Sequence, residues 1–212
     1  SRGIGAVVAC RLAEAGAKVG VNYHASPDAA KIVVDSINNS GGEAVLCGGD
    51  VSPEEAAESV IKMMIEHFGN IDILINNAGI NKDQLLIRMK PEDFDSVINV
   101  NLRGAFLCTR YAMTHLIRQR SGRIINMSSV VGLSGNPGQA NYAAAKAGVM
   151  ALTRCAALEV ADKGIRINAV SPSFAAHPFL VKTTPAEEPA AREAREAHGR
   201  RAAPGGVCPI PT

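Results

Sequence analysis

Apolar and polar positions in this chain alternate between short apolar runs and longer stretches in which apolar residues recur every three to four positions. The short runs are typical of strands, and the longer stretches are typical of helices that bury one face. We count six strands and assign residue ranges to five of them: 17–22, 43–47, 71–75, 123–127 and 165–170. Helices are predicted at residues 4–15, 29–40, 53–68, 91–120 and 140–162.

Strands that alternate with helices predict an α/β fold, a doubly wound parallel sheet of the Rossmann type with helices on both faces. A first strand is expected before Ser1, because the chain begins within a turn that opens a helix. The largely apolar run at residues 71–75 indicates a strand buried on both faces. Ser52 is the predicted N-cap of the helix that starts at Pro53.

The end of the chain has a different composition from the rest. Residues 185–212 are rich in Ala, Arg, Glu, Pro and Gly and contain almost no large apolar residues. Such a segment cannot supply a core strand and is predicted to be a low-complexity, disordered tail. The folded domain is therefore predicted to span residues 1–184, and the last strand of the sheet is expected to be missing as well as the first.

Composition excludes several classes of function. The chain has 212 residues, 47% of them hydrophobic, which predicts one domain with a substantial core. A formal net charge of +2 provides no basic field for nucleic acid, and no apolar run is long enough to cross a membrane. Five scattered cysteines without a CxxC spacing predict neither a disulfide framework nor a metal site. We expect a cytoplasmic protein, and the absence of a GxSxG motif disfavours a serine hydrolase.

Ligands of open α/β sheets bind beyond the carboxyl ends of the strands, so the candidate site lies in the loops there. The turn formed by Arg2, Gly3, Ile4 and Gly5 opens a helix whose first amides suit a pyrophosphate. The same sequence also suits an ordinary glycine turn.

Two further loops at strand ends carry small or polar residues. Asp50 and Val51 follow one predicted strand, and Asn77, Ala78 and Gly79 follow the next. These residues provide a surface that suits adenine and ribose. Alternatively, the aspartate is an N-cap or turn residue and the asparagine side chain bonds to the turn backbone.

Tyr142 and Lys146 lie four residues apart in a predicted helix, so their Cβ atoms are expected to be about 5–6 Å apart. A nearby ammonium group favours phenolate and lowers a tyrosine pKa from about 10 toward the range of a general acid. The same spacing also occurs on helices without function. Ser129 either donates to a substrate carbonyl or caps its loop, and Asn101 either faces solvent or makes a specific hydrogen bond.

Six motifs in order carry a resemblance that no single one carries. They are SRGIG, GDV, NNAG, NVNLxG, SSVVG and YAAAK. Together they resemble the short-chain dehydrogenase/reductase family, and the chain is most similar to its β-ketoacyl-[acyl-carrier-protein] reductase group. The resemblance covers about residues 1–174.

The resemblance implies a role for each matched residue. Tyr142 would donate a proton to the substrate carbonyl, while the cofactor supplies a hydride. Lys146 would hold the nicotinamide ribose and lower the Tyr142 pKa, Ser129 would orient the carbonyl, and Asn101 would hold a water molecule in a proton relay. The cofactor would lie over Gly3, Ile4 and Gly5 at its pyrophosphate, beside Asp50 and Val51 at its adenine, and near Asn77, Ala78 and Gly79 at its ribose.

NADP(H) is predicted rather than NAD(H). An acidic residue at the end of the family's second strand would repel a 2′-phosphate. In this chain that strand corresponds to residues 17–22, and the residues that follow it, Tyr23 and His24, are not acidic; His24 is a candidate cofactor-binding residue. Arg2 is placed to meet the phosphate, as in the NADP-dependent members of the family.

The resemblance also implies a substrate and an assembly. The substrate would be a ketone, such as a 3-oxoacyl thioester on acyl carrier protein, that is reduced to a secondary alcohol. Two alternatives stay open: an alcohol or steroid dehydrogenase of the same family, or an inactive fragment that serves as an interaction module. A homodimer through the helices at residues 91–120 and 140–162 is expected rather than a tetramer.

Overall fold

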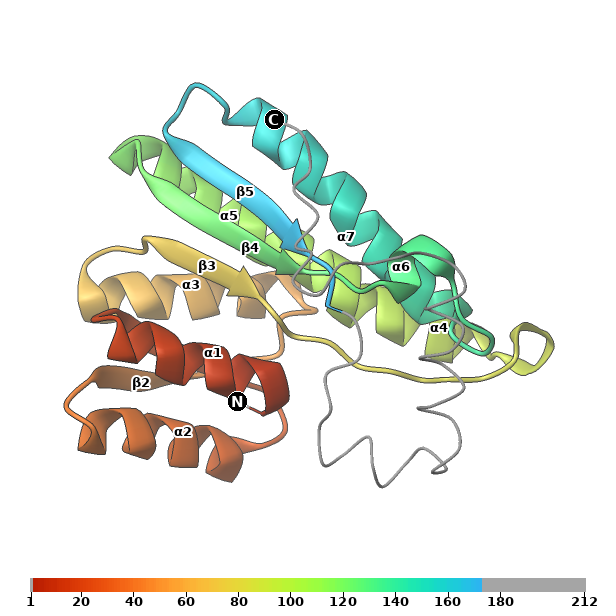
Figure 1. Cartoon of the computed structure of the whole chain (residues 1–212), viewed down its shortest axis with the longest axis horizontal. Coiled ribbons are helices and arrows are strands. Elements are labelled where there is room, and N and C mark those ends of the chain that lie inside the picture. Colours follow the sequence, from red (N-terminus) through yellow and green to blue (C-terminus); the bar gives the residue numbers. More distant parts are fainter. Residues whose placement is uncertain (1, 173–212) are drawn as a thin grey trace, which may run out of the picture.

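The computed structural model describes residues 2–172 of the chain, and Figure 1 labels its elements. The helices are α1 (Gly3–Glu14), α2 (Pro27–Asn39), α3 (Glu54–Phe68), α4 (Pro91–Ile98), α5 (Gly104–Gln119), α6 (Val131–Ser134) and α7 (Ala140–Glu159). The strands are β1 (Lys18–Tyr23), β2 (Glu43–Gly48), β3 (Ile73–Asn76), β4 (Gly122–Met127) and β5 (Ile165–Val170). Each placed strand is present close to its predicted position, but the sixth counted strand has no counterpart within residues 2–172. The predicted tail lies outside the described residues.

All strand pairs are parallel, as predicted, but they form two groups. β1 pairs with β2, and β4 lies between β3 and β5 in the second group. In a doubly wound sheet with the order 3-2-1-4-5-6, the first strand lies between the strands that correspond here to β1 and β3. The division of the sheet therefore falls where the strand expected before Ser1 belongs.

Helices pack on opposite faces of the strands. α1 and α2 cover the face of β1 that carries Val19 and Val21, whereas Gly20 on the other face approaches Met64 of α3. A second apolar cluster joins α3, α5 and α7 to β4 and β5 and includes Leu107, Leu116, Ile124, Ile165 and Ile167. Each such side chain contributes roughly 1.5–3 kcal/mol by burial.

β3 is less buried than its apolar sequence predicts. Ile73 is 40% exposed, and Leu74 and Ile75 are only half-buried. Within residues 2–172, β3 pairs with a strand on one side only, and Figure 1 shows no helix in front of its near face. The prediction of a strand buried on both faces is therefore wrong for the part of the chain that the structure describes.

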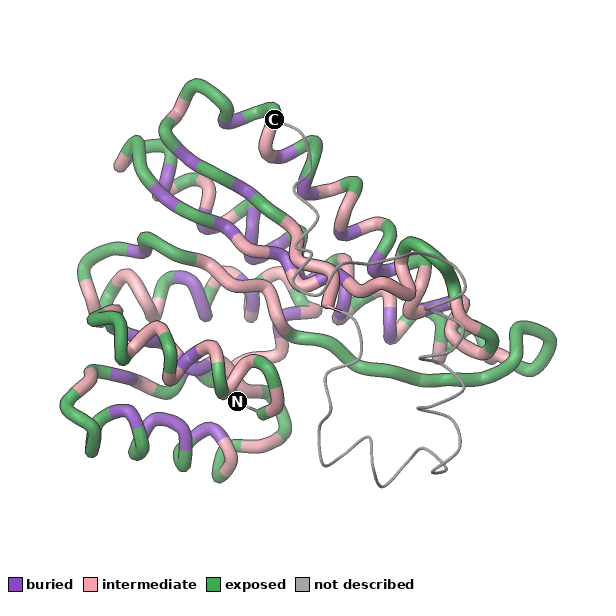
Figure 2. The backbone as a smooth tube through the Cα atoms, viewed as in Figure 1, coloured by how far each residue is buried: buried purple, intermediate pink, exposed green. Residues whose placement is uncertain are grey.

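The predicted helix at residues 91–120 is not continuous. A π-helical turn, Asn99–Arg103, separates α4 from α5 and contains Asn101. Such turns lose regular i to i+4 bonding and frequently occur at functional sites. The segment that joins β3 to α4 is mostly exposed, as the green stretch in Figure 2 shows, and includes a 3₁₀ turn at Leu86–Arg88.

The start of α3 also differs from the prediction. Pro53 occupies the N-cap position with extended backbone angles, and no side chain caps the helix. The Ser52 hydroxyl instead donates a 2.8 Å hydrogen bond to Asp50. Among the helices of residues 2–172, none is long and apolar enough to cross a membrane.

Candidate active site

The carboxyl ends of β3, β4 and β5 point toward the side of the molecule on which α6 and the first turn of α7 lie (Figure 1). The N-terminal end of α1 lies on this side too. Side chains from the loops after β3 and β4 therefore meet residues from the starts of α1 and α7, at the edge that the sequence predicts for the site.

Tyr142, Lys146 and Ser129 come together at this edge, as predicted. Lys146 follows Tyr142 by one turn of α7, and its Nζ atom lies 5.6 Å from the centre of the Tyr142 ring. The Lys146 side chain is buried, and its ammonium donates a 2.6 Å hydrogen bond to the main-chain oxygen of Met127 at the end of β4. The Ser129 hydroxyl lies near enough to the Tyr142 phenol to lower the pKa of that phenol, and it accepts a 3.2 Å bond from the N–H of Val131.

The electrostatics differ from the sequence prediction. Burial raises the pKa of Tyr142, hydrogen bonding with Ser129 lowers it, and the Asp83 carboxylate raises it, with a net rise above its usual value of 10.0. Burial lowers the pKa of Lys146 from 10.5 to about 8. The expected lowering of the Tyr142 pKa by Lys146 is therefore wrong for this arrangement, in which desolvation of the phenol dominates.

The loop after β4 fixes the middle of α7. Ser128 is buried, and its hydroxyl donates a 2.8 Å bond to the main-chain oxygen of Lys146. A Cβ atom added to Gly132 would lie 2.9 Å from the main-chain nitrogen of Ala147, so only glycine permits this close approach of α6 to α7. The active-site lysine is consequently held at both its backbone and its side chain.

Asn101 lies in the π-turn and is buried. Its Oδ1 accepts a 2.8 Å bond from the N–H of Ile80, and its Nδ2 donates a 3.0 Å bond to the oxygen of Ile80. The specific hydrogen bond that the sequence offered as one alternative is thus confirmed. The side chain clamps the loop after β3, where a Cβ atom added to Gly79 would lie 3.3 Å from Asn101 Oδ1.

The start of α1 lies against the same loop. Arg2 is the N-cap and is exposed, and Gly3 begins the helix with a φ of 52°, which glycine adopts without strain. A Cβ atom added to Gly5 would lie 2.5 Å from Nδ2 of Asn77. The first turn of α1, including Ile4, is thereby placed next to the exposed Ala78 and Gly79.

The side chains of the residues predicted beside the adenine mainly stabilise the fold. Burial raises the pKa of Asp50, but hydrogen bonds from the Ser52 N–H and hydroxyl and the charge of His24 outweigh it, so the pKa lies below 3.8. The turn alternative for Asp50 is confirmed. Val51 is 8% exposed and belongs to the apolar core near Gly104, so only its main chain is available to a ligand. His24 is exposed just after β1.

Sequence reasoning missed a buried polar network behind the site. Asn76 donates a 2.7 Å bond to Asn126, which donates a 2.9 Å bond to Thr153, and Thr153 donates to the oxygen of Val149 at 2.7 Å. It joins β3, β4 and α7 within the layer that carries Tyr142. Asparagine within the apolar run of a predicted strand was the available signal, because a buried amide requires partners.

Asn141 was missed as well. It directly precedes Tyr142 and is fully buried, and its amide bonds to main-chain atoms of a distant segment. The spacing of charged and hydroxyl residues gave no indication of it, because its partners are backbone atoms.

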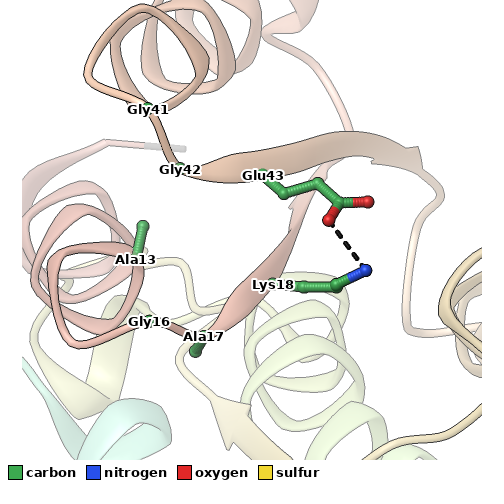
Figure 3. Close-up of a pocket in the computed structure, with 7 residues that line it drawn as sticks. All are labelled: Ala13, Gly16, Ala17, Lys18, Gly41, Gly42 and Glu43. Carbon is green, nitrogen blue, oxygen red and sulfur yellow. Dashed lines mark ion pairs between the residues drawn. The ribbon is translucent and has the colours of Figure 1, made fainter.

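A separate cavity of about 440 Å³ lies at the opposite edge of the strands (Figure 3). It is lined by the end of α1 and the starts of β1 and β2, where Lys18 and Glu43 form a 2.8 Å ion pair. Its lining contains glycine and alanine but no hydroxyl, phenol or histidine, so it does not offer the chemistry of the site at the carboxyl edge.

Comparisons with known proteins decide the family. The family model described as short chain dehydrogenase matches residues 1–188. The chain belongs to the short-chain dehydrogenase family. Family membership confirms the resemblance seen in the sequence and identifies the chain as an oxidoreductase homologue.

Curated relatives of this short-chain dehydrogenase include 3-oxoacyl-[acyl-carrier-protein] reductases. Those of Staphylococcus epidermidis and Staphylococcus aureus are 49% identical over 174 residues, which is 82% of this chain and 71% of each relative. The Synechocystis protein is 50% identical over 176 residues, covering 83% of this chain and 71% of the relative. The chain is therefore similar to this reductase group, as predicted.

The fold is likewise similar to a solved member of the family. A crystal structure of a short chain dehydrogenase from Mycobacterium avium matches with a TM-score of 0.73 and 40% sequence identity. The match covers 78% of this short-chain dehydrogenase and 62% of the other chain, so this chain spans less than two thirds of that protein's length. The Rossmann-like α/β fold is thus confirmed.

Proposed function

We propose that this chain is an NADP(H)-dependent reductase that converts a ketone, such as a 3-oxoacyl thioester on acyl carrier protein, into a secondary alcohol. The observation that carries the proposal is the meeting of Tyr142, Ser129 and buried Lys146 at the carboxyl edge of the strands. The hydroxyls of Tyr142 and Ser129 are hydrogen-bond donors suited to a carbonyl oxygen, and Lys146 places a cation beside the phenol.

The roles follow from the contacts. The Tyr142 hydroxyl donates its proton to the substrate oxygen, and the Ser129 hydroxyl orients that oxygen and stabilises its developing charge. The phenolate left behind lies next to the Lys146 ammonium, whose Nζ is 5.6 Å from the ring centre. The cofactor, when bound, supplies the hydride to the carbonyl carbon.

The residues at the starts of α1 and of the loop after β3 fit a dinucleotide. Main-chain N–H groups in the first turn of α1 lack helical partners, and the helix dipole favours a negative group there. Gly5 lets Asn77 approach the backbone closely, and Gly3 adopts a positive φ of 52°. Gly3, Ile4, Gly5, Asn77, Ala78 and Gly79 would hold the pyrophosphate and ribose, and the main chain of Asp50 and Val51 the adenine side.

Turnover with NADPH is the direct test of this function. The chain is expected to oxidise NADPH in the presence of acetoacetyl-CoA, and NADPH is expected to raise its melting temperature because a ligand of the folded state stabilises by mass action. The absence of both turnover and a thermal shift would contradict the proposal and would favour the inactive interaction module. Turnover of simple alcohols with NADP⁺ but not of the thioester would favour the alcohol dehydrogenase alternative.

Preference for NADP(H) is proposed to depend on Arg2. Its guanidinium is exposed at the N-cap of α1, and no acidic residue ends β1. Arg2→Ala is expected to raise the KM for NADPH roughly ten- to hundredfold, since a charge-assisted bond contributes about 1.5–3 kcal/mol, and to leave the KM for NADH unchanged. Initial-rate kinetics with both cofactors measure this.

Arg11→Ala is the matched control for Arg2→Ala. Arg11 lies on the same helix, is exposed, and pairs with Glu14 at 2.7 Å on the solvent face. Its removal should leave both KM values unchanged. An equal increase for NADPH and NADH in Arg2→Ala would show that the arginine does not recognise the 2′-phosphate.

Assembly and location remain predictions. A homodimer through α5 and α7 is supported by exposed apolar residues on these helices, Phe106, Ile117 and Leu158. Sedimentation of the Leu158→Asp variant beside wild type measures the predicted association. A cytoplasmic setting rests on the sequence expectation alone.

A further inference from the structure

Asn141 occupies the second position of α7, directly before Tyr142, and is 0% exposed. Its Nδ2 donates a 2.9 Å hydrogen bond to the main-chain oxygen of Lys82 and approaches the oxygen of Asp93 at 3.5 Å. Its Oδ1 accepts a 2.7 Å bond from the N–H of Tyr142. One amide thus joins the backbone of Tyr142 to the segment between β3 and α4 and to α4 itself.

The amide of Asn141 is fully buried, so leaving its own donor or acceptor without a partner would be costly. The Tyr142 N–H belongs to the first turn of a helix, where the N–H groups have no intrahelical partner. Leaving a buried donor or acceptor unpaired costs roughly 1–3 kcal/mol. Asn141 satisfies the N–H of Tyr142 and the oxygen of Lys82 with a side chain that has both a donor and an acceptor.

Three further contacts near Asn141 join residues 82–84 to the start of α7 and to α4. The N–H of Gln84 donates to the oxygen of Gly138 at 2.8 Å, and Nε2 of Gln139 donates to Asp83 at 2.8 Å. Lys82 forms a 2.9 Å ion pair with Asp93 of α4. Residues 82–84 are therefore held along the start of α7, although most of their own connecting segment is exposed (Figure 2).

Residues 82–84 also influence the electrostatics of Tyr142. Asp83, which Gln139 holds, is the charged group that raises the Tyr142 pKa together with burial. Ser129 from the loop after β4 acts in the opposite direction. The position of residues 82–84 thus contributes to the environment of the phenol.

We propose that Asn141 is a positioning residue that locks residues 82–84 onto the first turn of α7 and thereby fixes the Tyr142 hydroxyl opposite Ser129. The catalytic consequence rests on the function proposed above, whereas the positioning itself does not. Asn141 contacts neither substrate nor cofactor in this scheme and acts only through Tyr142.

Two variants separate the halves of the Asn141 side chain. Asn141→Ala removes all of its bonds. Asn141→Asp keeps the acceptor for the Tyr142 N–H, and with it the start of α7, but loses the donor to Lys82. Asn38→Ala is the control, because the Asn38 amide likewise bonds one main-chain oxygen and one main-chain N–H, both of Ala44, at 3.2 and 2.7 Å, but far from Tyr142 in the sequence.

Three measurements on these variants test the proposal. Both Asn141 variants are expected to lose about 10²-fold in kcat, the cost of a small misplacement, with the KM for NADPH unchanged. Trypsin is expected to cleave after Lys82 faster than in wild type. In Asn141→Ala, the tyrosinate absorbance assigned to Tyr142, by difference from Tyr142→Phe, is expected to titrate at lower pH than in wild type, because release reduces both burial and the influence of Asp83.

The outcomes are distinct. Wild-type kcat in Asn141→Ala, or a loss of kcat matched by Asn38→Ala, overturns the positioning role. If wild type itself shows no turnover, the proposed function fails but the positioning role is still decided. An unmoved Tyr142 titration together with unchanged cleavage after Lys82 then overturns it, and a shifted titration with faster cleavage supports it.

Discussion

Tyr142→Phe is expected to lower kcat for NADPH-dependent ketone reduction by about 10²–10⁴-fold, the usual contribution of a positioned general acid. Phenylalanine keeps the ring that lies 5.6 Å from Lys146 Nζ but cannot donate a proton or bond to Ser129. Binding of NADPH should persist, because the first turn of α1 and the loop after β3 are unaltered. Steady-state rates and a fluorescence titration with NADPH measure the two effects separately.

Tyr111→Phe is the control for this result. The Tyr111 hydroxyl also makes a hydrogen bond, 2.7 Å to Glu54, but it lies between α5 and α3, away from Ser129 and Lys146. Tyr111→Phe also removes a phenolic oxygen, but it leaves the proposed proton donor Tyr142 in place, so kcat should stay within about twofold of wild type. Equal rates for Tyr142→Phe and wild type would exclude Tyr142 as the acid.

Lys146→Met is expected to abolish catalysis. It is also expected to change stability in a pH-dependent way: the free energy of unfolding of the variant, compared with that of wild type, is higher at neutral pH than at alkaline pH. Lys146 is 4% exposed, and burial lowers its pKa from 10.5 to about 8. At ~1.36 kcal/mol per pH unit this fall corresponds to about 3 kcal/mol of unfavourable burial of the charge. Methionine has a similar length and no charge to desolvate.

The sign of the pH dependence follows from proton binding. The folded pKa lies below the unfolded one, so between about pH 8 and 10.5 the unfolded chain binds more protons at Lys146 and wild type gains stability as pH rises. Below about pH 8 the full penalty is present. The advantage of Lys146→Met is therefore largest below pH 8 and decreases by about 3 kcal/mol up to pH 10.5.

The stability that Lys146→Met gains by removing the buried charge is partly offset by the loss of a hydrogen bond. Without the 2.6 Å bond from Lys146, the oxygen of Met127 loses its donor, which costs roughly 1–3 kcal/mol at any pH. Urea unfolding across this pH range gives the difference from wild type, and Lys31→Met on the exposed face of α2 reports the effect of removing a surface lysine. A difference that grows with pH between 8 and 10.5 would contradict the assignment of a depressed Lys146 pKa.

The contrast between the two variants would show how the site is built. A loss of activity in Tyr142→Phe would assign the function to the hydroxyl of Tyr142, whereas the buried Lys146 imposes a cost on the fold. A chain that loses activity and gains stability on replacement of one lysine carries its cation for chemistry rather than for packing.

Local pattern determined most of the fold and part of the arrangement of the candidate site. Alternating strand and helix periods placed five parallel strands, and the i to i+4 spacing placed Tyr142 beside Lys146, because both depend only on neighbours along one element. The order of the motifs was enough to indicate the family that the comparisons then confirmed.

Only the tertiary structure decided what depends on distant partners. The π-turn around Asn101 forms where its amide meets Ile80, and the pKa of Tyr142 rises because packing partly buries its phenol. Asp50 forms a turn with Ser52 instead of capping α3. The sequence did not indicate the role of Asn141, because its hydrogen-bond partners are backbone atoms, which every residue has. Burial and long-range hydrogen bonds arise from packing of segments far apart along the chain, so no local period encodes them.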